Sequence, residues 1–100
     1  MQVIDVDFEK YIKHVSGKKK GNILLFAIST CGWCRLTKDL FNELGVDYRY
    51  VYVDLLESKA KSEANKEVSR WNPEESFPTI IINKKCIIGF QEDEIRRLLE

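Results

Sequence analysis

The sequence has few of the features that mark fibrous, disordered or membrane-spanning chains. Two prolines and five glycines in 100 residues exclude collagen-like and low-complexity classes. The longest apolar runs are about six residues, against roughly 20 needed to cross a bilayer. We therefore expect no membrane partner. The segment Met1–Asp5 is not a basic stretch followed by an apolar one, which predicts that a secretory signal is absent.

Neither sign of charge is in excess. Lys plus Arg and Asp plus Glu number 16 each, so no global attraction to nucleic acid is expected. The one basic run, at 18–20, lies between two glycines and is typical of a solvated loop.

Cysteine is also scarce. An odd count of three does not suit a disulfide-stapled secreted domain, and it favours a reducing, cytoplasmic location.

Hydrophobic periodicity predicts a single α/β domain over residues 1–100, in which 1–21 form an N-terminal helix and loop extension. Phe8, Tyr11, Ile12 and Val15 have helical spacing, with Asp5 or Asp7 as the cap. The remaining elements are expected in the order β, α, β, α, β, β, α: 23–28, 35–44, 48–55, 57–71, 79–83, 86–88 and a last helix from Glu92.

Two details of these elements can be tested in the structure. For the helix that contains the amphipathic stretch 35–44, Ser29 or Thr30 is the expected cap and Gly45 the expected end. Its inward stripe is expected to be Leu36, Leu40, Phe41 and Leu44. Helical crossovers make the first two strands parallel, and the last two form an antiparallel hairpin that turns at Asn83.

Cys31-Gly32-Trp33-Cys34 is the strongest functional signal in the chain. The motif lies between a buried strand and an amphipathic helix, where two thiols are placed for thiol–disulfide exchange. Cys31 at the helix N-terminus would be stabilised as a thiolate by unpaired N–H groups and the helix dipole, with Arg35 or Lys38 adding positive charge. Cys34, one turn later, would resolve the mixed disulfide formed at Cys31.

Three landmarks in order resemble the glutaredoxin branch of the thioredoxin fold. Cys31–Cys34 matches the family's C-P-Y-C, Ser76-Phe77-Pro78 its T-V-P, and Ile88-Gly89 its G-G. The resemblance implies a three-layer fold with a four-stranded mixed sheet, and a cis bond before Pro78. It also implies substrate binding by the Phe77 backbone and Pro78. Trp33 is expected to contact a partner or to cover the disulfide, and Gly89 to admit a substrate backbone or to make a tight turn.

The departures from the family pattern bear on the electron donor. Many glutathione-using members have a lysine where this chain has Ile28. Ile88 of this chain stands where the family has the first glycine of its G-G pair. The run from Gly89 to Ile95 is similar to glutathione-independent redoxins, which are recharged by a thioredoxin-reductase-type enzyme. An isoleucine offers no partner to a glutathione carboxylate. We therefore predict a monomeric reductant of protein disulfides, without an organic cofactor, recharged by a thioredoxin-reductase-type or ferredoxin-linked reductase.

Other functions are open at this level. Gly32 in place of proline is compatible with a glutaredoxin-type iron–sulfur carrier, in which Cys31 from two subunits and small thiols hold a [2Fe–2S] cluster. A binding module on an inactive scaffold and a purely structural cysteine pair are further alternatives. Zinc would need two more ligands, and only Cys86 and His14 remain. We expect Cys86 to be a small core residue, with redox sensing as the alternative, and His14 to be a surface residue.

Overall fold

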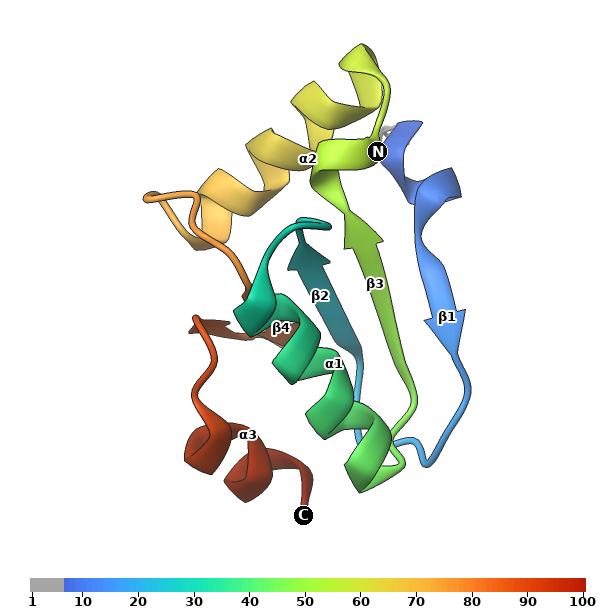
Figure 1. Ribbon diagram of the computed structural model, residues 1–100, viewed down its shortest axis with the longest axis vertical. Coiled ribbons are helices and arrows are strands. Elements are labelled where there is room, and N and C mark those ends of the chain that lie inside the picture. The colour runs from blue at the N-terminus through green and yellow to red at the C-terminus, as the bar shows by residue number, and fades with distance from the viewer. Residues whose placement is uncertain (1–6) are drawn as a thin grey trace.

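The computed structural model describes residues 7–100 as a five-stranded mixed sheet between two helical layers (Figure 1). The strand order across the sheet is β1-β3-β2-β4-β5. The elements are η1 (Asp7–Tyr11), β1 (Lys13–Val15), β2 (Ile23–Ala27), α1 (Gly32–Leu44), β3 (Tyr48–Tyr52), η2 (Val53–Leu55), α2 (Ser58–Trp71), β4 (Thr79–Ile82), β5 (Lys85–Ile88) and α3 (Glu92–Leu99), where η denotes a 3₁₀ turn.

The predicted strand directions are confirmed. Strand β2 runs parallel to β3 and antiparallel to β4, and β4 and β5 form the expected hairpin. Asn83 turns that hairpin with φ 57°, in the left-handed region that asparagine tolerates. The second predicted strand is shorter than expected, because its last residues form η2.

The sheet separates two apolar cores. On one side, α1 and α3 cover residues such as Leu25, Ile80 and Tyr48. On the other side, α2 and η1 cover Phe26 and Val51. Successive residues of β2 therefore face opposite cores, which explains why this strand lacks polar alternation. The three-layer thioredoxin-like architecture predicted from the sequence is confirmed (Figure 1).

The N-terminal segment corrects two predictions. Instead of a helix through Val15, the chain forms a short 3₁₀ turn and then strand β1, which pairs antiparallel with β3 and places Val15 opposite Tyr48. The sheet thus has five strands where four were predicted. Phe8 packs against Phe26 with ring centroids 6.0 Å apart. The segment is therefore an edge of the sheet and a part of the core. The predicted cap at Asp5 lies outside the described residues.

Helix α1 begins at Gly32, so Cys31 lies at the helix N-terminus as predicted, but the inward face of the helix is rotated. Leu36 is 45% exposed, because Cys34 and Thr37 take the inward positions of the first turns. Leu40 and Phe41 are buried as predicted. Gly45 ends the helix at φ 69°, the left-handed conformation expected at this position.

Among residues 7–100, no helix combines the length and apolarity required to cross a bilayer.

Candidate active site

Strand β2 leads directly into α1 (Figure 1), and Cys31 and Cys34 lie at this junction. Cys31 is itself the N-cap of the helix. Its Sγ accepts the backbone N–H of Cys34 over 3.0 Å, and its carbonyl accepts the N–H of Arg35 over 3.2 Å. The first turn therefore directs a peptide N–H at the sulfur, where it stabilises negative charge.

The predicted cap at Ser29 or Thr30 is wrong, because the Cys31 thiol takes that role. Ser29 instead binds the carboxylate of Asp54, which follows β3: its backbone N–H donates to Asp54 Oδ1 over 2.8 Å and its hydroxyl donates to Oδ2. These bonds lower the pKa of Asp54 against the opposing effect of burial. The contact ties the loop before the cysteines to the end of β3.

The two sulfurs occupy different environments. Cys31 is half-buried, whereas Cys34 is 1% exposed and packs in the core beneath α1. Burial is the main cause that raises the pKa of Cys34 to about 12, followed by its hydrogen bond with Cys31 and the charges of Cys31 and Asp54. A backbone hydrogen bond with Ile28 acts in the opposite direction. Cys34 therefore keeps its proton at neutral pH.

The Phe77–Pro78 peptide is cis, as the resemblance implied. The Phe77 carbonyl oxygen lies 3.9 Å from Cys31 Sγ, so the segment before β4 faces the sulfur of Cys31, the outer of the two. The Gly89 N–H donates to the Pro78 carbonyl over 2.9 Å, which brings the end of β5 to the same place. Gly89 has φ 82°, and a Cβ there would meet no atom within 4 Å. The tight turn therefore accounts for the glycine, and the space beside it is open.

The predicted substrate-binding residues meet at one small pocket of about 210 Å³. It is lined by Trp33, Phe77, Pro78, Gly89 and Phe90. Trp33 stacks on Phe90 with ring centroids 5.9 Å apart, and it remains 61% exposed. Phe90 was not among the predicted site residues. Its signal was an apolar side chain directly after the glycine that ends the hairpin.

Among residues 7–100, no charged residue lines this pocket. Of the two cations expected to assist Cys31, Arg35 is exposed, and Lys38 is directed at the tyrosines of β3. Lys38 Nζ donates to the Tyr52 hydroxyl over 3.0 Å and lies 3.9 Å from the centre of the Tyr50 ring. Ile28 directly follows β2 and is half-buried, and Ile88 is 41% exposed.

The other candidate ligands lie elsewhere. Cys86 is half-buried on β5, opposite Ile81, and burial raises the pKa of its thiol. His14 is exposed, as predicted, but it lies on β1 and not on a helix; its Nε2 is 2.9 Å from the Asp47 carboxylate. Within residues 7–100 no group of three or more His, Cys, Asp or Glu side chains is placed to hold a metal ion.

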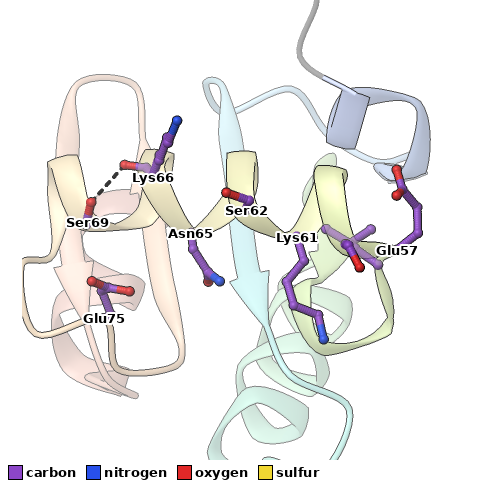
Figure 2. A pocket seen from close by; sticks show the side chains of 9 residues that line it. Glu57, Lys61, Ser62, Asn65, Lys66, Ser69 and Glu75 are labelled. Atoms are coloured by element: carbon purple, nitrogen blue, oxygen red, sulfur yellow. Dashed lines mark hydrogen bonds between the residues drawn. The ribbon is translucent and has the colours of Figure 1, made fainter.

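A larger hollow, of about 710 Å³, runs along the outer side of α2 (Figure 2). Its lining is polar and carries both signs of charge: Leu56, Glu57, Ser58, Lys61, Ser62, Asn65, Lys66, Ser69 and Glu75. None of these residues belongs to the cysteine site. Thiol chemistry is therefore assigned to the smaller pocket beside Cys31, despite its size.

A Cys-x-x-Cys pair at the N-terminus of α1, opposite a cis-proline, defines a thiol–disulfide oxidoreductase of the thioredoxin fold. The glutaredoxin family model matches residues 23–87. The chain belongs to the glutaredoxin family.

Solved structures with high identity have the same fold. The glutaredoxin from Methanosarcina mazei Go1 is 53% identical, with a TM-score of 0.81 over 89% of this chain and 87% of that chain. The methanoredoxin of Methanosarcina acetivorans is 54% identical, with a TM-score of 0.80 over 83% of this chain and 88% of that one.

Curated relatives are more distant. An uncharacterized glutaredoxin-like 8.6 kDa protein from the rubredoxin operon of Clostridium pasteurianum is 28% identical over 78% of this chain and 97% of its own length. The mitochondrial glutaredoxin-2 of Bos taurus is 28% identical over 67% of this chain, which spans 41% of that protein.

Proposed function

We propose that this protein is a cytoplasmic, monomeric dithiol oxidoreductase that reduces protein disulfides through Cys31 and Cys34. One observation carries the proposal: the outer sulfur caps α1 and accepts a peptide N–H at 3.0 Å, while its partner is buried one turn below. Such a pair has one sulfur prepared for attack and one held in reserve. An odd count of three cysteines suits a reducing compartment better than a disulfide-stapled secreted domain.

The exchange proceeds in two balanced steps. The Cys31 thiolate attacks one sulfur of the substrate disulfide, a Cys31–substrate bond forms, and the other substrate sulfur leaves as a thiolate that takes up a proton. Cys34 then loses its proton and attacks Cys31 Sγ. The second substrate sulfur leaves and is protonated, and a Cys31–Cys34 disulfide remains. Two electrons have passed to the substrate.

The environment of Cys34 sets the order of these steps. Burial, the hydrogen bond to Cys31 and the negative charge of Cys31 all raise the pKa of Cys34. Formation of the mixed disulfide removes that charge and that hydrogen-bond partner. The pKa of Cys34 then falls, because two of the interactions that raise it are lost. Cys34 is thus more easily deprotonated in the mixed disulfide than in the reduced protein, although burial, the largest cause, still raises its pKa.

Substrate docks, in this proposal, on the pocket beside Cys31. An extended segment of the substrate pairs with the Phe77 backbone and crosses the open space at Gly89. The apolar pocket of Trp33, Pro78 and Phe90 takes a side chain next to the substrate cysteine. Because the lining carries no charge, an apolar side chain suits it better than a carboxylate.

The residues that flank the thiol site support recharge by a reductase rather than by glutathione. A tripeptide with two carboxylates needs cationic or N–H partners, and Ile28 and Ile88 supply neither from their side chains. Lys38 is bound to tyrosines of β3. The donor is therefore a thioredoxin-reductase-type or ferredoxin-linked enzyme, which presents its own thiols on a protein surface.

A donor screen tests this function. Reduction of a protein disulfide is measured with three systems: glutathione with its reductase, an NADPH-linked thioredoxin reductase, and a ferredoxin-linked reductase. Turnover is expected with a reductase and not with glutathione. Ile28→Lys, which places an ammonium three residues before Cys31, should gain activity with glutathione. Efficient turnover of the unaltered protein by glutathione would contradict the proposed donor.

The second candidate function is an iron–sulfur carrier. A Cβ on Gly32 would meet no atom within 4 Å, so the Cys31 side of α1 is open to a second copy of the chain. Within residues 7–100 the thiol site lacks further ligands, so a cluster would need Cys31 of two copies and small thiols. Anaerobic reconstitution separates the functions: a colourless monomer supports exchange, and a brown dimer that is lost in Cys31→Ser supports the carrier.

A further inference from the structure

The segment between α2 and β4 (Figure 1) brings Phe77 to Cys31 and is anchored by a buried polar cluster. Asn72 and Thr79 are both 0% exposed, and they are two of only three buried polar residues in the described part of the chain. Burying an amide and a hydroxyl is costly unless their hydrogen bonds are made. Two such groups on either side of the cis-proline segment therefore need an explanation.

The Asn72 carboxamide binds the whole loop. Its Nδ2 lies 3.1 Å from both the carbonyl and the hydroxyl oxygen of Ser76, and 2.9 Å from Thr79 Oγ1. Its Oδ1 accepts the N–H of Glu74 over 3.2 Å. The Asn72 carbonyl accepts the N–H of Glu75, which turns the loop at φ 55°. Thr79 Oγ1 in turn donates to the Ser76 carbonyl over 2.7 Å.

Two donors from the core thus converge on one acceptor, the carbonyl oxygen of Ser76. This carbonyl and the Phe77 N–H belong to the same peptide unit, which is trans, so they point in opposite directions. Holding the Ser76 oxygen toward Asn72 and Thr79 turns the Phe77 N–H the other way. The orientation of that N–H decides whether an extended substrate can pair with Phe77.

We propose that Asn72 and Thr79 are positioning residues for disulfide exchange: their hydrogen bonds to the Ser76 carbonyl aim the Phe77 N–H at a substrate backbone docked at Cys31. The proposal rests on the proposed function and adds residues that touch neither sulfur. It accounts for a buried carboxamide and hydroxyl beside Phe77–Pro78, where apolar side chains would fill the same space without needing partners.

Thr79→Val tests the proposal because it keeps the shape of the side chain and removes the hydroxyl. Two substrates are compared: an extended peptide disulfide, and 2-hydroxyethyl disulfide, which has no peptide backbone to pair with Phe77. We expect KM for the peptide to rise about tenfold, as for one lost hydrogen bond, with kcat within about twofold. Kinetics with 2-hydroxyethyl disulfide should be unchanged. Thr79→Ser, which restores the hydroxyl, should bring the peptide KM back.

Val46→Ala is the matched control for lost stability. Val46 is buried beyond the C-terminal end of α1, at the opposite end of that helix from the cysteines. The variant should lower Tm and leave both KM values unchanged. A Thr79→Val protein with a lower Tm and an unchanged peptide KM would overturn the proposal, as would equal losses on both substrates. Failure of the unaltered protein to reduce either disulfide would instead refute the proposed function.

A second measurement leaves Asn72 and Thr79 unchanged. Amide hydrogen exchange of Phe77 is followed by NMR in the Cys34→Ser protein, alone and as a mixed disulfide with the peptide. Protection of the Phe77 N–H is expected to increase at least tenfold in the mixed disulfide. The Ile80 amide, inside β4, serves as the reference. An unchanged Phe77 rate in the mixed disulfide would overturn the proposal.

Discussion

The Cys34 peptide N–H donates to Cys31 Sγ across 3.0 Å, so the helix holds the outer sulfur through the backbone of the inner cysteine. This bond does not depend on the Cys34 side chain. Replacing the inner sulfur therefore leaves the support of the outer one in place, and the two steps of exchange become separable.

Cys31→Ser is expected to abolish reduction of protein disulfides, because the attacking sulfur is gone. Cys34→Ser should still form the Cys31–substrate bond but should be unable to resolve it. Mass spectrometry of the second variant, incubated with a peptide disulfide, should show a stable mixed disulfide. Cys86→Ser is the control and should turn over normally. Full turnover by Cys31→Ser would refute the assigned role.

The two thiols should differ in reactivity toward iodoacetamide. Near pH 8 we expect Cys31 to be alkylated in the folded protein, while Cys34 reacts only after unfolding, because it is 1% exposed and its pKa is raised to about 12. Peptide mapping after timed quenching measures both rates. Equal labelling of the two cysteines in the native protein would contradict this difference.

The raised pKa of Cys34 also predicts how stability varies with pH. The fold favours the protonated thiol, whose pKa rises from 9.0 to about 12. Below pH 9 the Cys34 thiol is protonated in both the folded and the unfolded protein, and its contribution to stability is complete. Between pH 9 and about 12 only the unfolded protein loses this proton, so the free energy of unfolding falls as pH rises. Unfolding free energies should fall more steeply in this range for the unaltered protein than for Cys34→Ser. Parallel pH profiles would count against the shift.

Phe8 tests whether the N-terminal segment belongs to the core. It is 5% exposed and packs on Phe26, so Phe8→Ala should lower the free energy of unfolding by about 3–5 kcal/mol. Tyr11→Ala, at a position 40% exposed, should cost less than about 1 kcal/mol. Chemical denaturation measures both. Similar small effects would mean that the segment is a dispensable addition.

Gly17 and Gly32 allow a paired test of how closely the chain packs around each glycine. A Cβ on Gly17 would lie 2.5 Å from the Val46 carbonyl carbon, whereas one on Gly32 meets nothing within 4 Å. Gly17→Ala should therefore cost about 1–3 kcal/mol. Gly32→Ala, in the first turn of α1, should be neutral or stabilising by up to about 1 kcal/mol. Thermal or denaturant unfolding compares them, and equal effects would contradict the close packing of Gly17.

Much of the site followed from local sequence signals. The apolar run before Cys31 and the amphipathic stretch after Cys34 placed the thiols at a strand–helix junction. The cis bond at Pro78 was implied only by the resemblance to a known family, because an X-Pro bond is trans by default. The cap of α1 was assigned to the wrong residue, because a hydroxyl at Ser29 is a stronger capping signal than a thiol and its bonds to Asp54 are not visible in the sequence.

The sequence by itself determined which segments alternate between strand and helix, and where the two thiols stand. These features depend on contacts between residues a few positions apart. The tertiary structure decided that Lys13–Val15 joins the sheet, that Trp33 stacks on Phe90, and that Asn72 and Thr79 hold the Ser76 carbonyl. Each of these depends on where remote segments meet or how a loop closes on itself, and that is set by packing of the whole domain rather than by local periodicity.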